Sequence, residues 1–313
     1  MSTISQAAQR SGSLSRLFRP RKEHERGWQL PWLWVLPAVV IMGAFHYVAD
    51  AAGAYYAFTD WTGASANAKF IGLRNFREIF SESSARGALW HTILLAACFV
   101  VLVNVIGLAL AVGLRRSVRS RHFIRALFFA PVIMSPLAVS YIWTYLFDFN
   151  GPVNGLLGIV GLASAQQDWL GSPTYAIWAV LVVLVWQFSG LAMIFYLAGL
   201  QGIPEDLNEA SEVDGARPWY RFRRITLPLL APAITVSATF TLILGLRLFD
   251  QVLALTGGGP VDATETLATQ VYKQTYVNGR FGYGAALSVV LTVLVMIIAL
   301  AQLAFLRARE RRI

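Results

Sequence analysis

Charged side chains gather in one short segment, residues 201–228, which separates two long apolar runs of the chain. Within it, Glu205, Glu209 and Glu212 follow one another at spacings of four and three residues, which places them on one face of a helix. Gly215 then provides a natural end for that helix. The spacing therefore predicts a short acidic helix followed by a turn.

A second short helix can begin near Pro218, with basic residues on one side and apolar residues on another. The basic side holds Arg217, Arg221 and Arg224, and the apolar side holds Trp219, Phe222 and Ile225. Two interpretations are open. The pair either lies at the membrane interface, where its arginines only set the topology, or it docks to a soluble partner.

Polar side chains inside the apolar runs form a second group of candidates, because such groups are costly in a bilayer and are often functional. They are Asn104, Gln187, Ser189, Thr241, Arg247, Asp250 and Gln251. Hydrogen bonding between helices is the alternative role for each of them. Arg247 and Asp250 are three residues apart, and we expect a local ion pair.

Nucleotide chemistry has no candidate residues in this chain. Lysine occurs only as Lys22, Lys69 and Lys273, and none follows the glycine spacing of a phosphate-binding loop. No nucleophile or metal-ligand constellation assembles either. We therefore expect no catalytic residue, no metal site and no cofactor in this chain, and a membrane-embedded enzyme is disfavoured.

The elements that hold these residues are predicted to be membrane-spanning helices. Hydrophobic residues make up 56% of the chain and charged residues 14%, and a helix of about 20 apolar residues spans the hydrocarbon core. Prolines at positions 37, 131 and 136 should kink the first and third spans. The fold class is thus all-α and polytopic, with spans near Leu30–Val48, Thr92–Leu114, Ala126–Phe147, Tyr175–Leu197, Leu229–Phe249 and Tyr283–Leu306.

Arginine and lysine positions predict the orientation. Most of the 26 basic residues lie before Trp28 or within 115–125, 217–224 and 307–312, and basic residues mark cytoplasmic loops. Both termini are therefore expected in the cytoplasm, with residues 1–27 as a basic tail and residues 28–313 as the transmembrane domain. The net charge of +9 fits topology and anionic lipid without a nucleic-acid partner.

A pattern over residues 209–232 resembles the EAA loop of binding-protein-dependent ABC importer permeases. It consists of Glu209, Ala210, Ser211, Asp214, Gly215, Ala216, Phe222, Ile225, Leu227, Pro228 and Pro232. "LTGGGP", Leu255–Pro260, resembles the segment before the last helix in the maltose-permease-like, carbohydrate-uptake branch, and "FIGLRNF", Phe70–Phe76, is a weaker match. Ser211 replaces an alanine of the motif, and the first external loop is short.

The resemblance implies the type I ABC importer permease fold, in a bacterial or archaeal plasma (inner) membrane. Residues 201–228 would be a coupling loop that docks into a separate ATPase. In that loop Glu209 would meet a basic residue of the ATPase, and Gly215 would allow the turn. Ala210, Ala216 and Phe222 would pack in the cleft, beside Ser211 and Asp214. ATP and magnesium would then be bound by the ATPase subunits, which form a dimer.

The resemblance also implies a pathway for a sugar or polyol, formed with a homologous second permease subunit. The positions carried over from the family are Gln187, Phe188, Leu191, Thr241, Leu244, Gly245 and Leu248, and Trp186 adds an aromatic face beside them. Leucine and glycine replace several asparagines of the family at these positions, so disaccharide specificity does not follow.

External loops would dock a soluble solute-binding protein, or else only connect the spans. The expected docking loop holds Thr256, Gly257, Gly258, Gly259 and Pro260, and residues 148–174 contain acids but no basic residue. An ion-gradient-driven secondary transporter is the alternative function. It should carry acids deep in its spans, and the sequence places none there.

Overall fold

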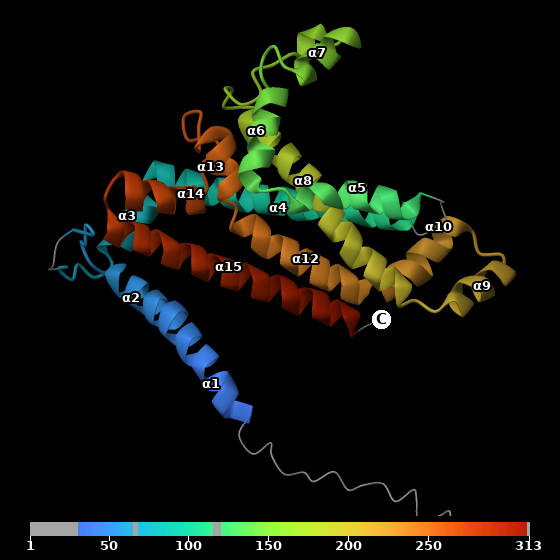
Figure 1. Ribbon diagram of the computed structural model, residues 1–313, viewed down its shortest axis with the longest axis horizontal. Helices are drawn as coiled ribbons and strands as arrows, with labels where there is room; N and C mark the ends of the chain where they lie inside the picture. The colour runs from blue at the N-terminus through green and yellow to red at the C-terminus, as the bar shows by residue number, and fades with distance from the viewer. Residues whose placement is uncertain (1–30, 65–67, 115–119, 312–313) are drawn as a thin grey trace, which may run out of the picture. The chain divides into compact units, whose positions relative to one another are not determined.

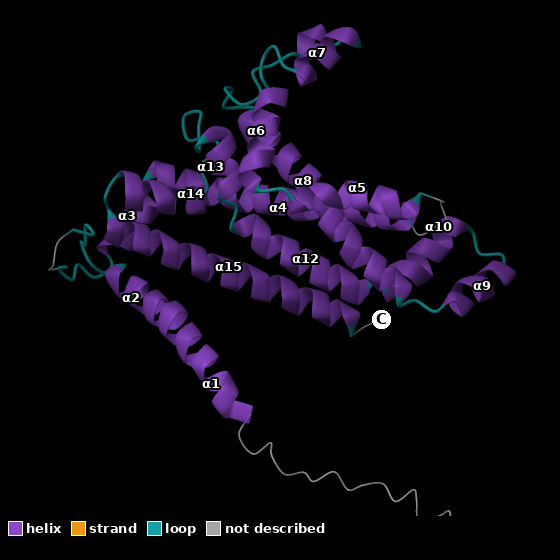
Figure 2. Ribbon diagram, in the orientation of Figure 1, coloured by secondary structure: helices purple, strands orange, loops and turns teal. Residues whose placement is uncertain are grey.

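The computed structural model describes residues 31–64, 68–114 and 120–311 (Figure 1). Within these ranges all regular structure is helical, and the only β-type pairing is an isolated bridge between Thr59 and Phe70 (Figure 2). The expected all-α class is therefore confirmed. The chain divides into two compact units, Met1–Ala52 and Gly53–Ile313.

The described part of the first unit is one apolar helical stretch. It begins with α1, Pro31–Met42, continues as a π-helix, Gly43–Val48, and enters α2, Ala49–Tyr56. The predicted span ended at Val48, but the helix runs on into α2. Pro37 lies inside α1, and a π-helical segment follows at Gly43–Val48.

Four long helices build the second unit: α4, Ser83–Gly113; α8, Ala176–Gln201; α12, Ala231–Leu246; and α15, Phe281–Glu310. The first three pack against one another, and α15 packs on α12 (Figure 1). Their shared core includes the fully buried Phe99, Val103, Leu184 and Met193.

Glycine permits the closest helix approaches in this core. A Cβ on Gly107 of α4 would lie 2.5 Å from Ala192 Cβ of α8. A Cβ on Gly190 of α8 would lie 2.0 Å from the carbonyl oxygen of Phe128. Small residues at such crossings allow the backbones to pack, as is typical of membrane helices.

The predicted third span is broken into two helices, α5, Arg121–Ile133, and α6, Pro136–Leu146, which meet at 100°. Proline disfavours helical backbone in the residue before it, and Ser135 is extended with a ψ of 144°. Its Oγ accepts a hydrogen bond from Ala138 N at 3.2 Å and caps α6. The expected kink is therefore a sharp corner.

A second corner of 69° separates the helical residues Pro218–Leu229 from α12. Among the described residues, four helices are long and apolar enough to cross a membrane, or up to six if each bent pair counts as one span. The six-span count and the cytoplasmic position of both termini remain predictions.

Short helices connect these elements. They are α3, Arg74–Ser81; α7, Pro152–Ile159; a 3₁₀-helix, Ala163–Ala165; α9, Glu205–Val213; α10, Pro218–Arg221; a π-helix, Phe222–Thr226; α11, Leu227–Leu229; α13, Asp250–Thr256; α14, Leu267–Tyr272; and a π-helix, Lys273–Val277.

Candidate functional site

The coupling segment, residues 201–228, folds as the predicted helix, turn and helix. Glu205 and Asp206 occupy the first turn of α9, where the helix dipole favours acids. After Asp214 the chain reverses at Gly215, whose φ of +71° is the left-handed conformation that glycine adopts without strain. Ala216 N donates to Ser211 O at 3.0 Å and closes the turn.

The second helix of this segment begins with Pro218, as its sequence predicts. Arg221 of α10 forms an ion pair with Glu212 of α9 and so ties the two short helices together. Trp219 and Phe222 pack with their ring centroids 5.6 Å apart. The helical path then continues through the π-helix into α11 and turns into α12.

Most of the predicted coupling residues are accessible. Glu209, Ala210, Asp214 and Gly215 are exposed. Ala216 and Phe222 are half-buried, whereas Ser211 is buried against the turn.

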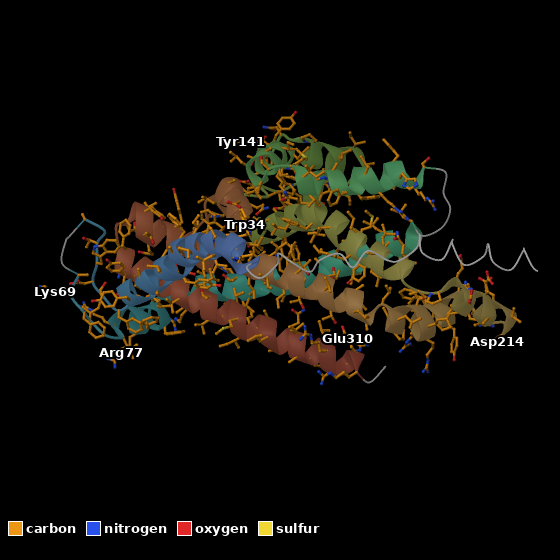
Figure 3. The ribbon with its side chains drawn as sticks, turned by 60° about the horizontal axis from the view of Figure 1, so that its bottom comes forward. Trp34, Lys69, Arg77, Tyr141, Asp214 and Glu310 are labelled. Carbon is orange, nitrogen blue, oxygen red and sulfur yellow. The ribbon has the colours of Figure 1, made fainter. Side chains whose placement is uncertain are left out.

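Two further residues of this segment were not among the predicted coupling residues. Val213 is 88% exposed and Trp219 is 70% exposed. Both are large apolar side chains that the coupling segment exposes among its charged residues. Asp214 marks the tip, which lies at the opposite end of the second unit from Lys69 and Arg77 (Figure 3).

The predicted pathway residues divide between two places. Trp186 is 40% exposed and lines an apolar groove of about 850 Å³ between α4, α5 and α8, together with Cys98, Val101, Phe128 and Val182. Its ring lies edge-on to Trp143, with centroids 5.5 Å apart.

The other predicted pathway residues pack between helices of the second unit: Gln187 faces the corner between α5 and α6 and also α13, whereas Thr241 faces α4. Gln187 is only 1% exposed; its Nε2 donates to Met134 O at 3.4 Å, and its Oε1 accepts from Gln251 Nε2 at 3.0 Å. Thr241 is fully buried and accepts a hydrogen bond from Asn104 Nδ2 at 2.9 Å. In this conformation both side chains therefore serve helix-to-helix hydrogen bonding, the alternative role expected for such residues.

Gly245 and the remaining pathway positions are packing residues here. A Cβ on Gly245 would lie 3.0 Å from the Phe99 ring, and Phe99 meets Phe188 edge-on at 5.7 Å. Leu248 is buried, and Leu191 and Leu244 are half-buried.

The expected ion pair between Arg247 and Asp250 is wrong. Both residues lie in the described part of the chain, and no contact within ion-pair distance joins them there. Arg247 follows the end of α12, and Asp250 occupies the first turn of α13. The helix ends between them, so the spacing of three residues does not bring the side chains together.

The predicted docking loop is a compact, cross-linked turn. Gly257 caps α13 with a φ of +61°, and Gly258 has a φ of +89°. Thr264 Oγ1 lies 2.7 Å from Thr256 Oγ1 and donates to Gly259 O at 2.7 Å. The loop is thus held by its own side chains rather than being a plain flexible connection.

Glu265, which follows this loop and belongs with Thr264 and Thr266 to the same resemblance, was not among the predicted docking residues. Its side chain is 1% exposed, Lys273 Nζ lies 3.6 Å from Oε2, and neither carboxylate oxygen has a hydrogen-bond partner among the described residues. Burial raises the pKa of the Glu265 carboxyl, and Lys273 opposes the rise. Lys273 also contacts Asp262 Oδ1 at 3.0 Å, and this contact raises the lysine pKa.

This cluster joins the loop to the first turns of α4. His91 Nδ1 lies 3.2 Å from Glu265 O, and Ser84 Oγ donates to Asp262 Oδ2 at 3.3 Å. The docking loop therefore lies at the N-terminal end of α4 and the C-terminal end of α12. The coupling segment precedes the N-terminal end of α12, so the two candidate surfaces occupy opposite ends of that helix (Figure 1).

Comparisons with known proteins identify the family of this chain. Residues 103–313 match the family described as "Binding-protein-dependent transport system inner membrane component". The "Multiple sugar-binding transport system permease protein MsmF" of Streptococcus mutans is 32% identical over 272 residues, which cover 87% of this chain and 93% of that protein. The "sn-glycerol-3-phosphate transport system permease protein UgpA" of Agrobacterium fabrum is 34% identical over 290 residues, which cover 90% and 95%.

A solved structure gives the same fold. It is the crystal structure of a bacterial ABC transporter that imports the acidic polysaccharide alginate, and one of its chains superposes with a TM-score of 0.77 at 23% identity, covering 90% of this chain and 95% of that one. The likeness confirms the fold expected for an ABC importer permease.

Proposed function

The chain belongs to the family of binding-protein-dependent transport system inner membrane components and is an importer permease subunit; from this premise we propose that its solute is a sugar or a related polyol. The relatives named above support this class, because one is named for multiple sugars and another for a glycerol phosphate.

The coupling segment carries the proposal for an ATP-driven mechanism. It is a rigidly closed helix pair that joins α8 to α12 and presents Glu209, Ala210, Val213 and Trp219 at its surface. A partner that binds the coupling segment can move both helices, as coupling between two distant sites requires. We propose that this partner is a separate ATPase dimer, which would bind ATP and magnesium.

The remaining partners follow from the same proposal. A homologous second permease subunit completes the pathway within a plasma (inner) membrane of a bacterium or archaeon. A solute-binding protein docks at the loop Thr256–Pro260, on the surface opposite the coupling segment. The cross-linked turn supports this role, because a preorganised loop loses less entropy on binding.

Solute would pass between the helices that carry Trp186, Gln187, Phe188 and Leu191 on α8 and Thr241, Leu244, Gly245 and Leu248 on α12 or directly after it. In the present conformation Trp186 lines the open apolar groove, and the other positions are closed by helix packing. Transport would therefore require α8 and α12 to shift relative to each other.

The solute class is tested with the cognate solute-binding protein and a panel of sugars, polyols and glycerol phosphodiesters. The proposed solute should raise the thermal unfolding temperature of that protein and should be taken up by proteoliposomes that contain the complete complex. A panel with no stabilising sugar or polyol would contradict the proposed class.

The energy source is tested in the same proteoliposomes. A complex whose ATPase subunits cannot hydrolyse ATP should transport nothing. Uptake that persists with this inactive ATPase and collapses with the ion gradient would instead establish the secondary-transporter alternative.

A further inference from the structure

The side-chain amide of Asn104, on α4, makes four hydrogen bonds. Nδ2 donates to Val100 O at 2.7 Å and to Thr241 Oγ1 at 2.9 Å. Oδ1 accepts from the Tyr196 hydroxyl and from Ser237 Oγ, each at 2.7 Å. An amide offers two donors and two acceptor positions, so the hydrogen-bonding capacity of Asn104 is fully used.

The chemistry of the partners sets the orientation of this amide. The Val100 carbonyl can only accept, so the nitrogen must face it. The Thr241 hydroxyl directs its own proton to Ser237 O at 2.8 Å and therefore accepts from Nδ2. The hydroxyls of Tyr196 and Ser237 must then donate to the oxygen. No other arrangement satisfies all four contacts.

The partners come from the two helices that flank the coupling segment. Tyr196 lies on α8, which ends at Gln201, directly before the segment. Ser237 and Thr241 lie on α12, which follows the segment. Asn104 on α4 thus contacts both α8 and α12. A displacement of the coupling segment would move these two helices.

The same contacts close the predicted pathway. Thr241 and Ser237 are fully buried, and their hydroxyls are engaged by Asn104 and by α12 itself. Separation of α8 from α12 would break the hydrogen bonds to Oδ1 or Nδ2. The released polar groups would lie one turn from Leu244 and Gly245, where the proposed function places the solute.

We propose that Asn104 is the positioning residue through which movement of the coupling segment opens the solute pathway. In the closed conformation the hydrogen bonds of the Asn104 amide hold α8 and α12 against α4. These bonds break when the coupling segment moves. This inference rests on the proposed function, since it requires a motor that moves the coupling segment.

The first test measures solute transported per ATP hydrolysed in the reconstituted complex. Ser237→Ala and Tyr196→Phe each remove one donor to Asn104, and Asn104→Leu removes the whole anchor. Ser288→Ala on α15 is the matched control, because among the described residues the Ser288 hydroxyl bonds only to Gly284 O of its own helix. Folding is checked by size-exclusion chromatography of every variant.

The three variants of the Asn104 hydrogen bonds, called the hub variants, should hydrolyse ATP even without the loaded solute-binding protein. The amount of solute transported per ATP hydrolysed should fall about 5-fold or more, the range of a typical coupling between sites. The control should match the wild type. If Asn104→Leu does not fold, the two single-hydroxyl variants decide the outcome. A wild-type ratio in both of these folded variants would overturn the proposal.

The second test needs no motor. Cys98 is the single cysteine of the chain, so Leu244→Cys in a Cys98→Ala background gives one reporter in the pathway. In the purified chain, loss of the hub should increase the rate at which a thiol reagent labels this reporter, and Ser288→Ala should not. Unchanged labelling in every hub variant would contradict the role of Asn104. Failure of the proposed function would appear instead as a wild-type complex without ATP-dependent uptake.

Discussion

At the scale of single residues, the glycine-rich loop depends on one close contact. Gly258 has a φ of +89°, and a Cβ there would lie 2.0 Å from Glu265 Oε2. Gly257 also has a positive φ, +61°, but no heavy atom of the described residues lies within 4 Å of its added Cβ. Alanine at either position therefore strains the backbone, but only alanine at Gly258 also meets Glu265.

We predict that Gly258→Ala damages the loop more than Gly257→Ala. Left-handed backbone costs an alanine about 1–2 kcal/mol at either site, and at Gly258 the buried Glu265 carboxylate would also have to move out of the way. The affinity of the purified complex for its solute-binding protein measures the effect. Equal losses in both variants would show that the Glu265 contact does not shape the loop.

The buried carboxylate should also make stability depend on pH. Because burial raises the pKa of Glu265, the folded protein keeps this proton at pH values where the unfolded chain has released it. The stability gained is complete below the unfolded value of 4.5 and is lost as pH rises through the higher folded pKa. Lys273, Asp262 and His91 face the same cluster.

Glu265→Gln isolates the contribution of Glu265, because the other three groups remain. We expect the variant and the wild type to have similar thermal stability in acid, and the variant to be the more stable at higher pH. Unfolding temperatures of the detergent-solubilised chain, measured from mildly acidic to mildly alkaline pH, give the comparison. A constant difference across this range would contradict the raised pKa.

At the scale of elements, the coupling segment depends on its turn more than on its ion pair. Glu212 is mostly exposed, so its pair with Arg221 contributes only about 0–1 kcal/mol. Gly215, in contrast, must hold a positive φ for the two helices to meet. The backbone conformation at Gly215 therefore sets how α9 and α10 are oriented in the coupling segment.

Gly215→Pro should abolish coupling, because proline fixes φ near −65° and cannot form this turn. Gly215→Asn is the matched control, since asparagine tolerates the left-handed conformation and no heavy atom of the described chain lies near the added Cβ. ATP-dependent uptake by proteoliposomes and co-purification of the ATPase report the result. Normal uptake with the proline variant would refute the role of the turn.

At the scale of the whole molecule, the second unit is held together by helices that approach closely at small residues. Gly107 and Gly87 both lie in α4, but they have different surroundings. A Cβ on Gly107 would meet Ala192 Cβ at 2.5 Å and Met193 N at 2.9 Å, whereas one on Gly87 would meet no heavy atom of the described residues within 4 Å.

We predict opposite effects of alanine at these two sites. Gly107→Ala should destabilise the packing of α4 on α8 by about 1–3 kcal/mol, whereas Gly87→Ala should be neutral or stabilise by about 0.4–1 kcal/mol. Thermal unfolding of the solubilised chain measures both. Equal stability of the two variants would mean that close packing of α4 on α8 at Gly107 contributes nothing to the free energy of unfolding.

The sequence by itself determined the helical fold class, the long apolar helices, the helix–turn–helix at 205–226 and the family. These features depend on local composition and spacing: apolar runs of spanning length, glycine and proline at the turn, and an extended motif. It also placed a break near Pro136, because proline restricts the backbone of the residue before it whatever the rest of the chain does.

Only the tertiary structure decided which polar residues meet. Asn104 contacts Thr241 and Tyr196 across large sequence separations, and Glu265 packs on Gly258 because the loop folds back on itself. The sequence placed Gln187 and Thr241 among the pathway candidates, yet helix packing buries both. Arg247 and Asp250 remain unpaired with each other because a helix end separates them. Such contacts depend on how helices approach in space, and spacing along the chain does not encode that distance.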